Sequence, residues 1–256
     1  ISISIAIVTL YGYPMLEYII IFLVGILVGG INGMAGGASV ISYPVLLATG
    51  MSPVSAAISN ALGVTPANFF ALIAVRDQMR AYFQEYKTLI YISIVGSTIG
   101  AFLLLNVPPG VFEKMVPFLL LFASLSFLIK AKPDRGARHG LVEKIGIAGS
   151  GLYCGYFGPG QGVMVIAVLA RDIRRDPKTL NTAKNLIVGW TSLISNIIYI
   201  FSGLAHWGAV IALLIGASIG GTYGGRYAAR MPVAVYRALI LTVGFGASAW
   251  LFTKYY

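Results

Sequence analysis

Long stretches of this chain contain no charged side chain, and this feature limits the possible folds more than any other. The first lysine or arginine is Arg76, and the eight acidic residues all lie at the edges of apolar runs or between them. A charge at the centre of a bilayer costs about 3 kcal/mol or more, so the uncharged runs are predicted to enter a membrane. Only 10% of the 256 residues are charged, whereas soluble domains carry roughly 25%. A water-soluble globule is therefore excluded.

The lengths of the apolar runs predict how they sit in the bilayer. A straight helix needs about 20 residues to cross a hydrocarbon core of about 30 Å. The runs 38–50 and 162–170 are too short for this, and each follows a glycine-rich break, as halves of broken or re-entrant elements do. We predict an all-α polytopic membrane protein with eight to ten membrane elements, from the runs near 14–33, 38–50, 53–75, 88–107, 114–129, 145–158, 162–170, 179–202, 208–228 and 235–253.

The basic residues predict the orientation of these elements. They are grouped in four segments between the runs: Arg76, Arg80 and Lys87; Lys130, Lys132, Arg135, Arg138 and Lys144; Arg171, Arg174, Arg175 and Lys178; and Arg226, Arg230 and Arg237. Such segments are expected in the cytoplasm, which explains the formal charge of +10 without a nucleic-acid partner. If each short run returns to its starting side, each half crosses the membrane an odd number of times. The second half is then inverted relative to the first.

An internal repeat supports this division. Shifting the chain by 125 residues aligns Gly30, Gly33 and Gly37 with Gly155, Gly158 and Gly162, Asn60 with Asn185, and Gly96 and Gly100 with Gly221 and Gly225. The alternative is chance identity between two apolar sequences. A true repeat predicts two inverted-topology halves, at 1–129 and 145–256, joined by a cytoplasmic loop at 130–144. Inverted repeats are common in secondary transporters, whose substrate sites lie where broken helices of the two halves meet.

The two glycine-rich breaks are the candidate binding elements. New helices are expected to begin near Gly37 and near Gly160 to Gly162, and a helix start offers free N–H groups and partial positive charge to an anion. We therefore select Gly36, Gly37, Ala38, Gly160, Gln161 and Gly162 as candidate substrate-binding residues. The alternative is close helix packing, which we prefer for Gly25, Gly29, Gly96, Gly100, Gly221 and Gly225.

Polar residues inside two apolar runs complete the candidate site. Lys184 lies just inside the run 179–202, where it either faces a wet cavity and pairs with an anion or extends back to the membrane boundary. Ser59 is its counterpart in the repeat. Asn60 and Asn185 either donate to the substrate or bond between helices.

These motifs together resemble the sulfite exporter TauE/SafE family over nearly the whole chain. The matching segments are Gly30 to Gly37, Ser42 to Leu46, Ala57 to Asn60, Gly155 to Gly162, Thr182 to Asn185 and Gly203 to Trp207. The resemblance implies a permease with two inverted repeats for sulfite, sulfoacetate or another sulfonate, usually in the export direction. Members of the family often carry further glycines where this chain has Ala38 and Ser39, so the size of the site is expected to differ.

The predicted function is alternating-access secondary transport of a small sulfur-containing anion across the inner (plasma) membrane, by a multi-pass protein. An anion channel is the alternative. The chain has no phosphate-binding loop for ATP, and no acidic residue inside an apolar run, so we do not expect an enzyme, a metal site or a cofactor. The single Cys154 excludes a disulfide framework. The expected partners are the anion and the lipid bilayer, and a homodimer stays open.

Overall fold

In the computed structural model, residues 14–34, 36–128, 140–227 and 233–256 are described. These residues form ten α-helices and one short 3-10 helix, with no strand among them. The helices are α2 (Pro14–Met34), α3 (Ser39–Ala48), α4 (Pro53–Leu72), α5 (Met79–Asn106), α6 (Pro109–Ser126), α7 (Leu141–Tyr156), α8 (Gln161–Leu169), α9 (Pro177–Ile200), α10 (Trp207–Tyr227) and α11 (Val233–Tyr255), and the 3-10 helix η1 (Ile73–Gln78) precedes α5. The prediction of an all-α polytopic membrane protein is confirmed.

Four of these helices are long and apolar enough to cross a membrane by themselves. They contain the stretches Met15–Asn32, Val75–Asn106, Pro109–Ser126 and Arg237–Tyr255, and Ser39–Ala48 is a shorter apolar helix. The long helices α4 and α9 carry more polar residues, and many of these are buried against protein. In α9, for example, Asn185 and Ser195 are each 1% exposed. A helix that turns its polar side chains toward other helices does not need an apolar surface all round.

Two helix starts show how the sequence sets the boundaries. Ser52 precedes α4 and accepts a hydrogen bond from the amide of Ser55 at 3.2 Å, with Pro53 as the first helical residue. Asp176 precedes α9 and accepts from the amide of Thr179 at 2.8 Å, with a proline again in the first position. A side-chain acceptor followed by proline is a strong start signal for a helix.

Two boundaries differ from the prediction. The basic segment at 76–87 is not a loop, because η1 and the first turns of α5 include it. Likewise, α7 begins at Leu141, inside the predicted connecting loop; the part of that loop at 130–139 lies outside the described residues. Hydropathy locates the apolar core of a span, whereas the helix continues into the interface because charged residues are compatible with helical backbone.

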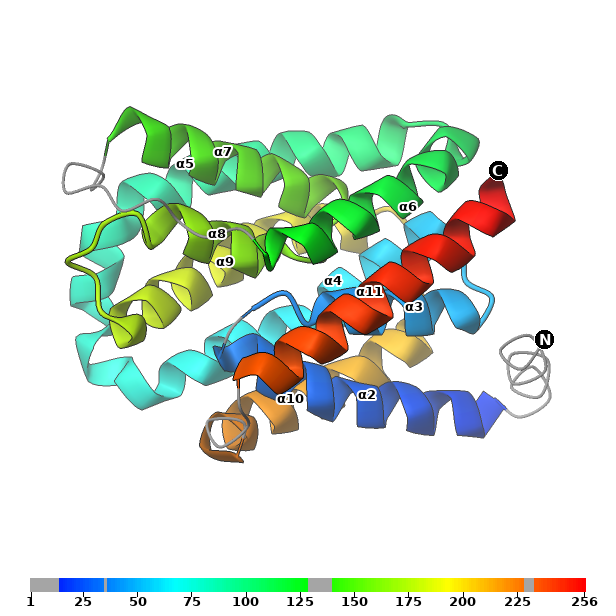
Figure 1. Cartoon of the computed structure of the whole chain (residues 1–256), viewed down its shortest axis with the longest axis horizontal. Coiled ribbons are helices and arrows are strands. Elements are labelled where there is room, and N and C mark those ends of the chain that lie inside the picture. The colour runs from blue at the N-terminus through cyan, green and yellow to red at the C-terminus, as the bar shows by residue number, and fades with distance from the viewer. Residues whose placement is uncertain (1–13, 35, 129–139, 228–232) are drawn as a thin grey trace.

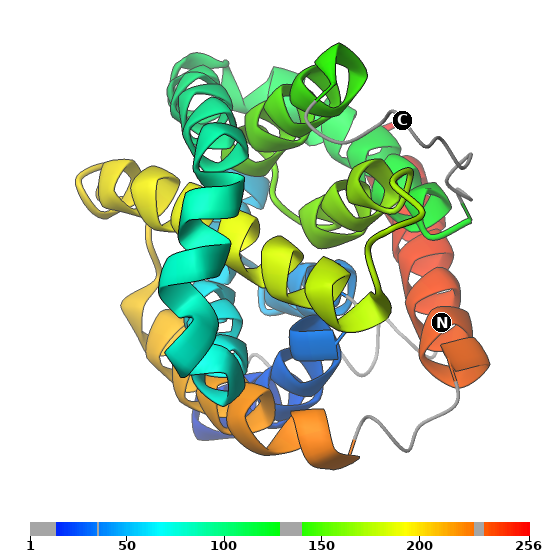
Figure 2. The ribbon, with the colours of Figure 1, turned by 90° about the vertical axis from the view of Figure 1, so that its left-hand side faces the viewer.

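The helices of the two predicted halves interlock. α2 packs along α10, α7 packs along α5, α4 crosses α9, and α6 packs against α11. Both views place α9 between α2 and α7 (Figures 1 and 2). The first helix of each half therefore packs against the fourth helix of the other half.

The directions of corresponding helices bear on the predicted inversion. In Figure 1, α2 runs from right to left and its counterpart α7 runs from left to right; α6 and α11 are opposed in the same way. This agrees with the inverted repeat, which stays a prediction because no membrane plane fixes the two orientations.

Small residues explain the close approach of the paired helices. A Cβ atom at Gly29 would lie 2.2 Å from the carbonyl oxygen of Ala217 on α10. A Cβ atom at Gly100 would lie 2.1 Å from that of Leu152 on α7. The packing interpretation of these glycines is confirmed.

Candidate functional site

The two glycine-rich breaks have similar backbone geometry. Gly36 and Gly37 have φ angles of 73° and 76° and precede α3, whereas Gly158 and Gly160 have φ angles of 95° and 93° and precede α8. Left-handed backbone of this kind is accessible to glycine at little cost. It ends one helix and allows the next to start in a new direction. The predicted helix starts near residues 37 and 160–162 are thus confirmed.

The two breaks touch each other in the middle of the protein. A Cβ atom built on Gly162 would lie 2.9 Å from the Cα of Gly36 and 3.3 Å from the amide nitrogen of Gly37. Only the absence of side chains permits this contact. The two glycine-rich breaks therefore lie together, and the N-terminal ends of α3 and α8 border the same region.

A small cavity lies at this junction. Its volume is about 40 Å³, and its wall is formed by Asn32, Gly37, Ser39, Asn60, Ala61, Val64, Thr65, Asn68, Cys154, Gly158, Gly160, Gln161, Gly162, Val188 and Ser192. A water molecule needs about 10–15 Å³ of such space, so the cavity holds a few water-sized groups. Its wall combines polar and apolar residues, and none of the described wall residues is acidic or basic.

The side chain of Gln161 is a polar group of this wall that has no hydrogen-bond partner among the described residues. Its side chain is 2% exposed, and neither its Oε1 nor its Nε2 has a hydrogen-bond partner. Other wall residues are paired: Asn32 Nδ2 donates to Asn68 Oδ1 at 3.2 Å, and Asn60 Oδ1 accepts from Ser42 Oγ at 2.5 Å. An unpaired buried amide is costly, so its partner is expected to be whatever fills the cavity.

Backbone donors lie beside this carboxamide. In the first turn of α8, the amides of Gln161 and Val163 donate to the carbonyl oxygens of Gly158 and Gly160 at 3.2 and 3.1 Å. The amides of Gly160 and Gly162 make no backbone hydrogen bond to a described residue. Both glycines line the cavity, so the start of α8 offers free N–H groups there.

Lys184 lies directly behind the crossing of the two breaks. It is fully buried, and its Nζ donates to the backbone oxygen of Asn32 and to Asn185 Oδ1, both at 2.6 Å. A Cβ atom built on Gly36 or on Gly162 would lie 3.4 Å from the Cδ of Lys184. The side chain therefore does not extend to the membrane boundary, and its Nζ lies at the C-terminal end of α2.

The predicted site residues divide into three groups. Gly37, Asn60, Gly160, Gln161 and Gly162 line the cavity. Gly36, Ala38, Lys184 and Asn185 are in or directly behind the two breaks, and their binding roles stay predictions. Ser59 is not among the cavity residues, and its Oγ accepts from the amide of His206 at 2.9 Å, just before α10; its binding role also stays a prediction.

Several wall residues were missed by the sequence reasoning. Val64 and Asn68 follow the predicted Asn60 at intervals of four residues, so all three share one face of α4. That spacing was a usable signal for a polar helix face. Ser192 and Cys154 gave no signal, because only the packing of α7 against α9 brings their side chains within 3.5 Å of each other.

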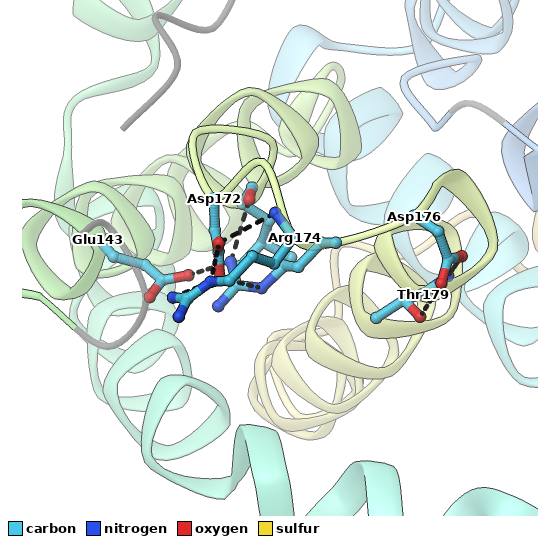
Figure 3. Close-up of polar contacts among 7 residues, drawn as sticks. Glu143, Asp172, Arg174, Asp176 and Thr179 are labelled. Carbon is cyan, nitrogen blue, oxygen red and sulfur yellow. Dashed lines mark hydrogen bonds and ion pairs between the residues drawn. The ribbon is translucent and has the colours of Figure 1, made fainter. Parts of the chain in front are cut away.

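A separate ionic cluster joins α7 to the loop before α9 (Figure 3). Arg175 Nη1 bonds to Glu143 and donates to the Leu169 backbone oxygen at 3.0 Å. Arg174 Nε donates to Asp172 Oδ1 at 2.8 Å and lowers the pKa of that carboxyl. None of these residues lines the cavity, so the cluster fixes the end of the α7–α8 hairpin.

Comparison with known proteins agrees with this architecture. A family model described as "Sulfite exporter TauE/SafE" matches residues 21–251. The probable membrane transporter protein YfcA of Escherichia coli K12 is 28% identical over 203 residues, covering 77% of this chain and 75% of the relative. A probable membrane transporter protein of Haemophilus influenzae is 30% identical over 206 residues, covering 77% and 80%. No solved structure gives a significant match.

Proposed function

The chain belongs to the sulfite exporter TauE/SafE family of membrane transporters, and from this premise we propose that it is a secondary transporter for a small sulfur oxyanion. The proposed substrate is sulfite or a short organosulfonate, and the proposed location is the inner (plasma) membrane. Its binding site is the cavity between the starts of α3 and α8.

The positive surroundings of the cavity carry this proposal. Two helix N-termini border it, and each contributes partial positive charge. The amino group of Lys184 lies behind the cavity, where it is bonded to the backbone oxygen of Asn32, and no aspartate or glutamate is among the described residues of the wall. A site with positive potential and no acidic side chain favours an anion over a cation or a zwitterion.

The geometry of the donors suits a compact oxyanion. Gln161 Nε2 and the amides of Gly160 and Gly162 are N–H donors without backbone partners on one side of the cavity. Hydrogen bonds to a charged group contribute about 1.5–3 kcal/mol each. The small volume admits a sulfite or sulfonate group and leaves little room for a bulky organic residue.

Alternating access is supported by the position of the site. The cavity draws its wall from α2, α3 and α4 of the first half and from α7, α8 and α9 of the second. Movement of one half against the other opens such a site to either side in turn.

The test is anion flux in proteoliposomes containing the purified protein. A panel of sulfite, sulfate, methanesulfonate and acetate is offered, and uptake of labelled anion is measured with and without unlabelled anion inside. We expect saturable uptake of sulfite or the sulfonate that is accelerated by internal anion. Uptake that is neither saturable nor accelerated indicates a channel, and no flux of any anion refutes the proposal.

A further inference from the structure

Lys184 combines complete burial with the absence of a counter-ion. Its side chain has 0% exposure. Among the described residues, no aspartate or glutamate lies within 4.0 Å of the Lys184 Nζ. The ion pairs of this part of the chain join Arg76 to Asp77, Arg174 to Asp172, and Arg175 to Asp172 and Glu143. Burying a charge without a partner costs several kcal/mol. No described carboxylate therefore compensates a positive charge at Lys184 in the empty protein.

The helices packed against α9 supply no compensation. They are α2, α4, α5, α7 and α8, and of these α4 and α8 contain no titratable residue. The titratable and charged residues of the remaining three, with those of α9 itself, are Glu17 and Tyr18 of α2; Arg80, Tyr82, Glu85, Tyr86, Lys87 and Tyr91 of α5; Glu143, Lys144, Tyr153, Cys154 and Tyr156 of α7; and Lys178 and Tyr199 of α9.

The acids of this set are occupied or distant. Glu143 is bound to Arg175. Glu17 lies in the first turn of α2, at the end opposite to Asn32. Glu85 lies in the second turn of α5 and forms no ion pair with Lys184. Of the others, Cys154 lines the same cavity.

The hydrogen bonds of Lys184 fit a neutral amine as well as an ammonium. An ammonium has three N–H donors, whereas the described residues provide two acceptors, the Asn32 backbone oxygen and Asn185 Oδ1. A neutral amine has two hydrogens, and these two acceptors satisfy both. Loss of the third proton therefore breaks no described hydrogen bond.

We propose that Lys184 carries the coupling proton, so that one proton moves with each monovalent anion. This inference rests on the proposed function, because it needs an anion in the cavity. The bound anion compensates the positive charge of the Lys184 ammonium. When the anion leaves, the ammonium loses its proton and the empty site is neutral again. Lys184 thus acts as a positioning and coupling residue behind the Asn32 segment rather than as a contact of the anion.

The cycle balances in protons and charge. On the loading side the neutral amine takes a proton from hydronium as the anion enters, which yields an ammonium, a bound anion and water. On the release side the anion leaves and the ammonium gives its proton to water, which restores the amine and forms hydronium. The protein returns with no net charge at this site, and the transport of a monovalent anion is electroneutral.

The test uses methanesulfonate, because its acid is fully ionised and no proton travels on the substrate itself. Proteoliposomes of the wild-type protein are held at zero membrane potential with potassium and valinomycin, and a pH difference of about one unit is imposed. For one proton per anion we expect accumulation of about tenfold toward the alkaline side, a factor worth about 1.4 kcal/mol. A pH-sensitive dye inside the vesicles should report proton movement together with the anion.

The Lys184→Arg variant separates coupling from binding. Arginine stays protonated in proteins, so a loaded site can exchange one anion for another but an empty site cannot return. We expect anion exchange to persist and accumulation driven by the pH difference to disappear. Lys184→Gln, which keeps an amide donor without a charge, should likewise lose this accumulation.

The outcomes distinguish this proposal from the proposed function. Wild-type flux of methanesulfonate that follows membrane potential and ignores the pH difference overturns the proton coupling and leaves anion transport intact. Retained accumulation in either variant also overturns it. If both variants fail to insert, the wild-type measurement decides alone. A wild-type protein that moves sulfite but not methanesulfonate rejects the coupling proposal. A wild-type protein that moves no anion rejects both proposals.

Discussion

Replacing Gln161 by leucine should lower anion binding without lowering stability, two effects that seldom occur together. The side chain is buried in the cavity wall, and neither of its polar atoms has a protein partner. Leucine has a similar size and contains no polar atom. The substitution therefore removes no hydrogen bond from the protein and relieves an unsatisfied buried amide, which costs about 1–3 kcal/mol.

The loss of binding follows from the same geometry. If Nε2 donates to the oxyanion, the bond to a charged acceptor contributes about 1.5–3 kcal/mol. This corresponds to a loss of affinity of about tenfold to about a hundredfold. The expected phenotype is a higher KM for anion uptake, together with a melting temperature equal to or above that of the wild type.

The assay pairs a thermal melt of the purified protein in detergent with the concentration dependence of uptake in proteoliposomes. Gln84→Leu is the matched control, because Gln84 is exposed near the start of α5, where it accepts from Lys87 at 3.3 Å. This control should leave KM unchanged. A melting temperature several degrees lower in Gln161→Leu, with unchanged KM, would show that the carboxamide is structural and refute the reasoning.

Two further predictions test the contact of the breaks and the pH dependence. Gly162→Ala places a methyl group 2.9 Å from the Cα of Gly36. This overpacking should lower the free energy of unfolding by about 1–3 kcal/mol and abolish uptake. In the control Gly149→Ala the new Cβ meets nothing within 4 Å, so uptake and the thermal melt should stay near wild type. The hydrogen bond from the Thr179 amide lowers the pKa of the Asp176 carboxyl. The carboxylate therefore stabilises the start of α9 at every pH above the ordinary pKa of an aspartate, and this stabilisation is lost as the pH falls through the lowered pKa. Asp176→Ala should therefore lower the melting temperature at neutral pH and lower it less in acid, and an equal effect at every pH in a series of thermal melts would contradict the capping role.

Much of the architecture could be predicted because the bilayer imposes strong rules on sequence. A backbone in hydrocarbon must satisfy its own hydrogen bonds, so each apolar run became a helix, and the glycine-rich breaks at 36–37 and 158–160 became the points where helices end. The helix boundaries at 79 and 141 were harder to predict, because charged residues continue a helix beyond the apolar core.

The candidate site was predictable only in part. Glycine and Gln161 at a break could be selected, since backbone that leaves a helix needs special residues and exposes donors. The role of Ser59 could not be predicted, because its hydroxyl bonds to an amide 147 residues away. The same limit applies to Asn32 and Ser192, which reach the cavity through contacts between helices.

The sequence by itself determined that the chain enters a membrane, that it is helical, and that two similar segments interrupt its helices. These properties depend on local composition and spacing, which act along the chain. Only the tertiary structure decided that the two interruptions touch, that Gln161 is left without a partner, and that Lys184 bonds to the end of α2 rather than reaching the membrane surface. These contacts depend on which helix faces pack together. Packing brings together residues that are far apart in the chain, and their spacing in the sequence does not predict the contact.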